Sequence, residues 1–114
     1  MSFLIKKIEL LDQIGIKDVL LDPGFGFGKT LEHNFSILRN LESFKTLNTP
    51  ILVGISRKSM ITNHLKINKI NSLNGTTALN MNALSKGAKV LRVHDVLPAM
   101  ECISLHEKIK NSNE

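Results

Sequence analysis

Apolar residues along this chain follow two different spacings. Residues 2–14 carry Leu4, Ile8 and Leu11 three or four positions apart, which predicts a helix, and Gly15 follows as a stop signal. Other apolar residues gather in short, mainly apolar runs, a pattern typical of strands that are buried on both faces. These runs occupy residues 19–21, 51–55 and 88–93.

Helical spacing returns between the apolar runs. Thr30 is placed to cap a helix of about 32–47, and Ser56 is placed to cap a short helix that ends at Leu65. After this helix the spacing has no clear period, so the sequence predicts a surface loop over 66–72.

A turn at Asn74 and Gly75 is expected to close that loop. Thr76 or Thr77 can then cap a helix that runs to Lys86, with a terminating glycine directly after it. A last helix is predicted after the third run, with Asp95 as its cap and Pro98 in its first turn.

The predicted order of elements, αβαβααβα, indicates parallel strands covered by helices in a single partial domain over 1–114. Three strands alone leave two sheet edges unpaired. A complete (β/α)₈ barrel needs roughly 200 residues or more, and this chain has 114. The fold class is therefore predicted to be α/β, as the last three units at most of an incomplete TIM barrel.

Composition narrows the class of protein. Lys and Arg are scattered and Trp and Tyr are absent, so there is no sign of a nucleic-acid surface despite a net charge of +5. No apolar run approaches the roughly 18 residues of a membrane span, and we expect a cytoplasmic protein without a targeting segment. The single Cys102 is interpreted as a small buried apolar residue.

The glycine-rich stretch DPGFGFGKT begins at Asp22, directly after the first predicted strand. Two nucleotide-binding motifs are near misses. Pro23 stands where a Walker A loop needs its first glycine, and the glycines follow G-x-G-x-G rather than G-x-G-x-x-G. The stretch therefore indicates a ligand-binding loop of another kind.

Polar residues follow each of the three predicted strands, where parallel strands would bring them to one face of the sheet. They are Asp22 after the first strand, Ser56, Arg57, Lys58 and Ser59 after the second, and Arg92 and His94 at the third.

These residue types suit a planar heterocycle and an anion. The Asp22 carboxylate can accept paired N–H donors of a ring, Lys58 can donate to a ring carbonyl, and Ser59 can donate to a carboxylate. Arg92 and His94 alternate in extended backbone and can clamp a phosphate. Structural roles stay open beside these: Asp22 as a turn initiator, Arg92 over a helix end, and His94 bonded to the residue after it.

Three stretches, DPGFGFGK, VGISRKSMI and NGTTALNMNALSKGAKVLRVHDV, resemble the C-terminal third of the bacterial dihydropteroate synthases, in order and over nearly the whole chain. That family consists of TIM-barrel transferases of folate biosynthesis. The resemblance implies about strands six to eight with their flanking helices. It also implies condensation of dihydropterin-6-ylmethyl diphosphate with 4-aminobenzoate, which releases pyrophosphate.

The resemblance assigns roles to individual residues. It implies that Asp22 and Lys58 bind the pterin ring, and that Phe27 and Ser59 border the 4-aminobenzoate. The diphosphate would be bound by a further group, which consists of Arg92, His94 and the backbone at Val93. Mg²⁺ is implied as a cofactor, with its protein ligand in an N-terminal part that this chain lacks.

Two loops that close over the substrates and half of the pterin pocket are also absent from this chain, so we expect a fragment that is inactive alone. A separately encoded N-terminal part is an expected partner, and the family's dimer, built from its last helices, implies contacts through 76–86 and 96–110. Two other interpretations stay open: a non-catalytic remnant of the enzyme, and a pterin-binding methyltransferase domain. The cations of SRKS and RVHD favour the synthase, because methyl transfer involves no diphosphate.

Overall fold

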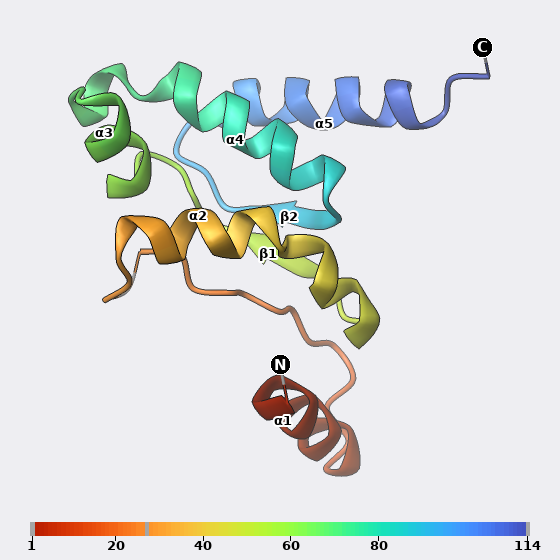
Figure 1. The fold of residues 1–114 in the computed structure, drawn as a ribbon. Coiled ribbons are helices and arrows are strands. Elements are labelled where there is room, and N and C mark those ends of the chain that lie inside the picture. Colours follow the sequence, from red (N-terminus) through yellow and green to blue (C-terminus); the bar gives the residue numbers. More distant parts are fainter. Residues whose placement is uncertain (1, 27, 114) are drawn as a thin grey trace.

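The computed structural model describes residues 2–26 and 28–113, and it confirms the α/β class. Short helices surround a small parallel sheet (Figure 1). The elements are α1 (Ser2–Gln13), α2 (Leu31–Arg39), the 3₁₀ helix η1 (Leu41–Leu47), β1 (Ile51–Val53), α3 (Ser59–Leu65), the 3₁₀ helix η2 (Lys69–Asn71), α4 (Leu73–Ser85), β2 (Ala88–Leu91) and α5 (Val96–Lys110).

The sheet pairs β1 with β2 in parallel, with Ile51 opposite Ala88 and Val53 opposite Leu91. Helix α4 packs against β2, α5 packs against α4, and α2 packs against α3. Helix α1, red in Figure 1, lies apart from these layers at the end of an extended segment. The carboxyl ends of β1 and β2 therefore lie at the same edge of the sheet, as the sequence predicts.

The first predicted strand, 19–21, is wrong in extent, because only Leu21 pairs with the sheet. Leu21 donates to Pro50 O at 2.8 Å and accepts from Leu52 N at 2.8 Å, which makes an isolated parallel bridge to Ile51. The next two bonds of a parallel ladder would need the N–H groups of Pro50 and Pro23, and proline has none. Prolines on both sides thus confine the pairing to one residue.

The core lies between the sheet and helices α2, α3 and α4. Leu41, Ile51, Val53 and Ile55 are essentially fully enclosed. Phe25 joins them from the glycine-rich loop with 1 % of its surface exposed. Burial of a side chain of this size is worth about 1.5–3 kcal/mol, so the loop is fixed to the core through Phe25.

The predicted helix of 32–47 divides into two parts. Thr30 caps α2 as expected, since its hydroxyl accepts the His33 N–H at 3.1 Å. At Asn40 the side-chain amide donates to Ser36 O at 2.9 Å, alongside the backbone N–H of the same residue at 3.0 Å. Asn side chains compete with helical hydrogen bonding in this way, and the chain continues as the tighter 3₁₀ helix η1.

Three predictions for residues 66–77 are corrected by the structure. The segment 66–72 contains η2, and α4 begins at Leu73 and runs through Asn74 and Gly75, where a turn was predicted. Close packing explains the difference, because a Cβ on Gly75 would lie 2.7 Å from Cγ2 of Ile61 in α3. Neither Thr76 nor Thr77 is a cap, because both lie inside α4.

The predicted caps near the strand ends are also corrected. Ser56 does not cap α3, which begins at Ser59 with Lys58 as its extended N-cap residue. Asp95 is the N-cap residue of α5, but its side chain makes no capping hydrogen bond. Both strands end two residues before the predicted runs do, at Val53 and Leu91.

Other expectations are confirmed. Gly87 has φ of +109° and ends α4, and its N–H donates to Leu84 O. Cys102 is buried on the inner side of α5, where burial raises the pKa of its thiol and Glu101 raises it further. Over the described residues, none of the helices has the length and apolar character needed to cross a membrane.

Candidate functional site

Asp22 lies directly after the bridging residue Leu21, at the edge where the strands end. Its Oδ1 accepts the N–H of Gly24 at 2.9 Å, and its Oδ2 accepts from Nη1 of Arg92 at 3.2 Å. Both side chains keep access to solvent, with 35 % of Asp22 and 53 % of Arg92 exposed. Two residues that the sequence predicts in one site thus form an ion pair.

The glycine-rich loop folds back over this edge. Gly24 and Gly26 have φ of +76° and +96°, which L-residues adopt rarely. The ammonium of Lys29 donates to Gly24 O at 2.8 Å. Asn34, buried in α2, accepts the Gly26 N–H at 2.7 Å and donates to Thr30 O at 3.1 Å. The sequence did not predict this role of Asn34, because nothing distinguishes it there from other polar residues of a helix.

Lys58 extends along the other side of the loop. Its Nζ donates to Phe25 O at 2.6 Å, and its aliphatic chain passes Gly26 so closely that a Cβ there would lie 3.4 Å from Cδ. Burial lowers the pKa of Lys58, and the positive charges of Arg92 and Lys29 lower it further, while Asp22 opposes them. Lys58 is thus an ammonium in a crowded cationic region.

The segment between β1 and α3 is shaped by contacts with α4 and α5. Arg57 adopts a positive φ of 56°. Its N–H donates to Oγ1 of Thr76 at 3.2 Å, and its guanidinium donates to Oδ1 of Asp95 at 3.0 Å. Thr76 therefore orients this loop, a function that its predicted role as a helix cap did not reveal.

Ser56 and His94 are directly bonded. The Ser56 hydroxyl lies 2.8 Å from Nδ1 of His94 and accepts the backbone N–H of His94 at 3.3 Å. The Ser56 hydroxyl can also donate to Nδ1, and in that tautomer the imidazole proton lies on Nε2. This arrangement leaves Nε2–H as a donor for an anion. The expected bond between His94 and Asp95 is replaced by this one.

A cavity of about 540 Å³ opens between the glycine-rich loop and the ends of the strands. It collects Lys58, Ser59, Ser56 and His94, which the sequence predicts near a ligand. Asp22 and Arg92 are not among its lining residues. The full lining consists of Phe25, Gly26, Ser56, Arg57, Lys58, Ser59, Lys69 and His94.

Three other residues bear on the site, of which Val93 and Phe27 were predicted and Lys69 was not. Lys69 lines the cavity from η2, a segment that showed no signal in the sequence beyond its charge. Val93 is half-buried between Arg92 and His94. Phe27, which the resemblance places beside 4-aminobenzoate, lies outside the described residues.

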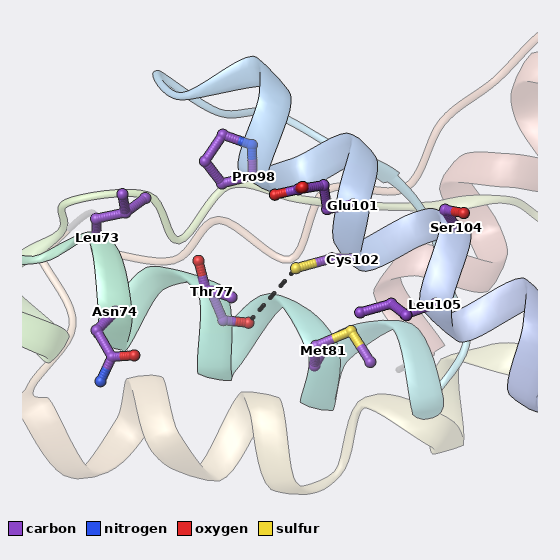
Figure 2. Close-up of a pocket in the computed structure, with 9 residues that line it drawn as sticks. All are labelled: Leu73, Asn74, Thr77, Met81, Pro98, Glu101, Cys102, Ser104 and Leu105. Atoms are coloured by element: carbon purple, nitrogen blue, oxygen red, sulfur yellow. Dashed lines mark hydrogen bonds between the residues drawn. The ribbon is translucent and has the colours of Figure 1, made fainter.

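A larger hollow of about 880 Å³ lies away from the strand ends, between α4 and α5. Figure 2 shows it flanked by Thr77 and Met81 of α4 and by Pro98, Cys102 and Leu105 of α5. Its lining is mainly apolar, and it lacks the cations that collect around the smaller cavity. We therefore place the candidate site at the strand ends and not at the larger hollow.

Comparison with known proteins identifies relatives of the whole chain. The family model described as pterin binding enzyme matches residues 1–94. Dihydropteroate synthase of Escherichia coli K12 is 42% identical over 98% of this chain and 40% of its own length. Dihydropteroate synthase of Haemophilus influenzae is 38% identical over 98% of this chain and 42% of its own length. The chain thus spans about two fifths of the length of these relatives.

Solved structures agree with the sequences. The structure of Yersinia pestis dihydropteroate synthase matches 97% of this chain and 53% of its own chain, with a TM-score of 0.91 and 37% identity. The Thermus thermophilus enzyme, solved in complex with 6HMPPP, matches 96% of this chain and 44% of its own, with a TM-score of 0.89 and 38% identity. On these grounds the chain belongs to the pterin-binding enzyme family and matches its dihydropteroate synthases.

Proposed function

We propose that this chain supplies one wall of a dihydropteroate synthase active site, with about strands six to eight of the TIM barrel. The observation that carries the proposal is the convergence of an anionic and two cationic groups, Asp22, Arg92 and Lys58, at the strand ends. Longer relatives, 42% identical in the case of the Escherichia coli sequence, are named dihydropteroate synthases, and one from Yersinia pestis is solved with a pterine-sulfa conjugate.

The proposed reaction is a substitution at the methylene carbon of dihydropterin-6-ylmethyl diphosphate. The amine nitrogen of 4-aminobenzoate forms the new C–N bond with its lone pair. The C–O bond to the diphosphate breaks, and its electron pair leaves with pyrophosphate while the amine loses a proton. Negative charge grows on the leaving group, so cations already oriented toward it would stabilise the transition state.

Asp22 and Lys58 are proposed to bind the pterin ring. One oxygen of Asp22 is fixed by the Gly24 N–H, which orients the carboxylate for paired N–H donors. The ammonium of Lys58 can donate to the ring carbonyl beside its bond to Phe25 O. Their opposite charges match the donor edge and the acceptor edge of such a heterocycle.

Ser59 and Lys69 are proposed to face 4-aminobenzoate, with Phe27 beside it. Ser59 is the first residue of α3 and lines the cavity, so its hydroxyl can donate to the carboxylate. Lys69 adds a positive charge to the same cavity from η2. An aromatic carboxylate would thus meet a donor and a cation in the part of the lining that comes from α3 and η2.

Arg92 and His94 are proposed to bind the leaving diphosphate, with the backbone at Val93 between them. Arginine suits a phosphate because its planar guanidinium can donate two parallel hydrogen bonds. The bond from Ser56 to Nδ1 leaves the Nε2–H of His94 as a second donor. Loss of these donors should weaken diphosphate binding more than pterin binding.

The described residues hold no ready-made cluster of Mg²⁺ ligands. Across residues 2–26 and 28–113 there is no group of three His, Cys, Asp or Glu side chains that could hold a metal ion. Asp22 is already engaged by Gly24 and Arg92. As the family resemblance implies, the protein ligand of Mg²⁺ is proposed to lie on a separate N-terminal part.

Two partners follow from the proposal. A separately encoded N-terminal part would complete the barrel and the pocket, so the chain alone is expected to be inactive. A second copy of the chain would pack on the outer side of α5, at the top of Figure 1. Near its first two turns α5 exposes four apolar residues: Val96, Leu97, Met100 and Ile103.

Isothermal titration of the purified chain with the pterin diphosphate tests the proposal. We expect heat of binding that Asp22→Asn and Arg92→Gln reduce, and that the exposed surface change Lys17→Met leaves unchanged. Absence of heat at high ligand concentration would favour the alternative that the chain is a non-catalytic remnant of the enzyme. Turnover by the chain alone, with both substrates and Mg²⁺, would contradict its incompleteness. Mixing with the uncovered part of the Escherichia coli relative should restore activity.

A further inference from the structure

Gly54 follows β1 directly and is buried against the guanidinium of Arg92. A Cβ built on Gly54 would lie 2.5 Å from Nη2, 2.9 Å from Cζ and 3.0 Å from Nε of Arg92. These three atoms are its nearest neighbours. The guanidinium therefore occupies the space that any side chain at position 54 would need.

The backbone at Gly54 does not itself require glycine. Its φ lies outside the left-handed region, unlike those of Gly24 and Gly26, so other residues could adopt its conformation. What glycine provides is close approach between a charged side chain and the main chain. The neighbouring hydrogen bond from Arg92 N to Val53 O, at 3.0 Å, fixes the backbone of the arginine beside it.

We propose that Gly54 is a positioning residue that allows the Arg92 guanidinium to lie across the end of β1, within reach of Asp22. Its value for catalysis rests on the proposed function, in which Arg92 binds the diphosphate. The three atoms nearest to a methyl group at position 54 all belong to the flexible end of Arg92. The arginine would therefore turn away while the strands stay paired.

The experiment compares Gly54→Ala with Arg92→Gln and with the double variant in the full chain. Inorganic pyrophosphate is the probe, titrated calorimetrically. Loss of a hydrogen bond to a charged group corresponds to roughly a ten- to hundredfold weaker Kd, and we expect each single variant to show it. Gly54→Ala displaces the Arg92 guanidinium and Arg92→Gln removes it. The double variant should therefore bind pyrophosphate no more weakly than Arg92→Gln does.

A second readout does not depend on ligand binding. The chain has three arginines, at positions 39, 57 and 92, so the Arg92 Nε–H resonance can be followed by nitrogen-15 NMR. Gly54→Ala should shift this resonance and leave those of Arg39 and Arg57 in place. The control Gly75→Ala adds the same methyl group against Ile61 and should leave Arg92 unchanged.

The outcomes separate the two proposals. If wild-type protein binds no pyrophosphate, the proposed function fails, and the NMR shift still decides the role of Gly54. An unchanged Arg92 resonance in Gly54→Ala, or additive losses in the double variant, would overturn the inference. If Gly54→Ala does not fold, Arg92→Gln in the same chain should restore folding, and failure to do so would equally overturn it.

Discussion

Asp22 and Arg92 form an ion pair at 3.2 Å across 70 residues of sequence. In the proposed reaction one of them binds the pterin ring and the other binds the diphosphate. Each group thus neutralises the other when no substrate is bound, and the substrate must replace this contact with its own. The pair keeps two charged ligand-binding groups in place while both remain partly hydrated.

Asp22→Asn should weaken binding of the pterin diphosphate by about ten- to a hundredfold, the range for hydrogen bonds to a charged group. Stability should change little, since partly exposed ion pairs contribute about 0–1 kcal/mol. Calorimetric titration and urea unfolding measure the two effects. Asp18→Asn is the matched control, because Asp18 is exposed on the same segment. Equal affinities in the two variants would contradict the role of Asp22.

Lys58 should make the stability of the chain rise with pH in the alkaline range. Burial lowers its pKa in the folded state below its ordinary value of 10.5. Between these two values the unfolded chain binds more protons, so the free energy of unfolding increases as pH rises. Below both pKa values the folded and unfolded states are both protonated, and the cost of the partly buried ammonium is fully present there.

Urea unfolding between pH 7 and pH 10 measures this increase. We expect Lys58→Met to show a smaller increase than wild type. Lys69→Met, which removes an exposed lysine of the same cavity, should follow the wild-type slope. Parallel profiles for wild type and Lys58→Met would show that burial of this ammonium is not linked to folding.

Ser56 should set the tautomer of His94. Two-bond nitrogen-15 NMR of neutral His94 should report a proton on Nε2 in wild type, because the Ser56 hydroxyl lies 2.8 Å from Nδ1. Ser56→Ala should produce a mixture of tautomers and weaker pyrophosphate binding. Its cost in stability should be about 1 kcal/mol, typical of one hydrogen bond. Ser85→Ala on α4 is the control, and an unchanged His94 spectrum would disprove the role of Ser56.

Asn34 should stabilise the glycine-rich loop. Asn34→Ala leaves the Gly26 N–H without its partner at 2.7 Å, and an unsatisfied buried donor costs about 1–3 kcal/mol. We expect a lower melting temperature and faster tryptic cleavage after Lys29. Asn82→Ala, on the exposed side of α4, should stay within about 0.5 kcal/mol of wild type. Equal cleavage rates would show that the loop does not depend on Asn34.

The outer side of α5 should control self-association. Met100 is 59% exposed on this helix, and Met100→Lys would place a charge within the proposed contact between copies. Sedimentation analysis should then show a dimer constant at least about tenfold weaker, because desolvating an unpaired charge is costly. Ile70→Lys, at an 86% exposed position on η2, should leave the constant unchanged. If the wild-type chain sediments as a monomer at all concentrations, the proposed contact between copies through α5 is contradicted.

The sequence was sufficient to predict which residues gather at the strand ends. Parallel strands place their carboxyl ends on one side, so positions after apolar runs carry spatial information. Asp22 and Arg92, which the structure pairs, and Lys58 were predicted in this way. This prediction needed only the positions of the apolar runs and the parallel direction of the strands.

Residues whose roles depend on approach between distant segments could not be predicted. Gly54 looks like any residue at a strand end until the guanidinium of Arg92 is seen against it. Thr76 was interpreted, together with Thr77, as a candidate helix cap. Its bond to Arg57 N could not be predicted, because it joins segments 19 residues apart. The short pairing of Leu21 follows from two prolines, but only once the register opposite Ile51 is known.

Leu21 is joined to the sheet by two hydrogen bonds, and the residue after it is Asp22. The free energy needed to open a segment locally is low where few hydrogen bonds hold that segment. The amides of 16–21 should therefore exchange with solvent earlier than those of β1 and β2. Ligand affinity and global stability are therefore expected to be separable, because Asp22, the proposed ligand-binding carboxylate, lies next to the segment expected to open first.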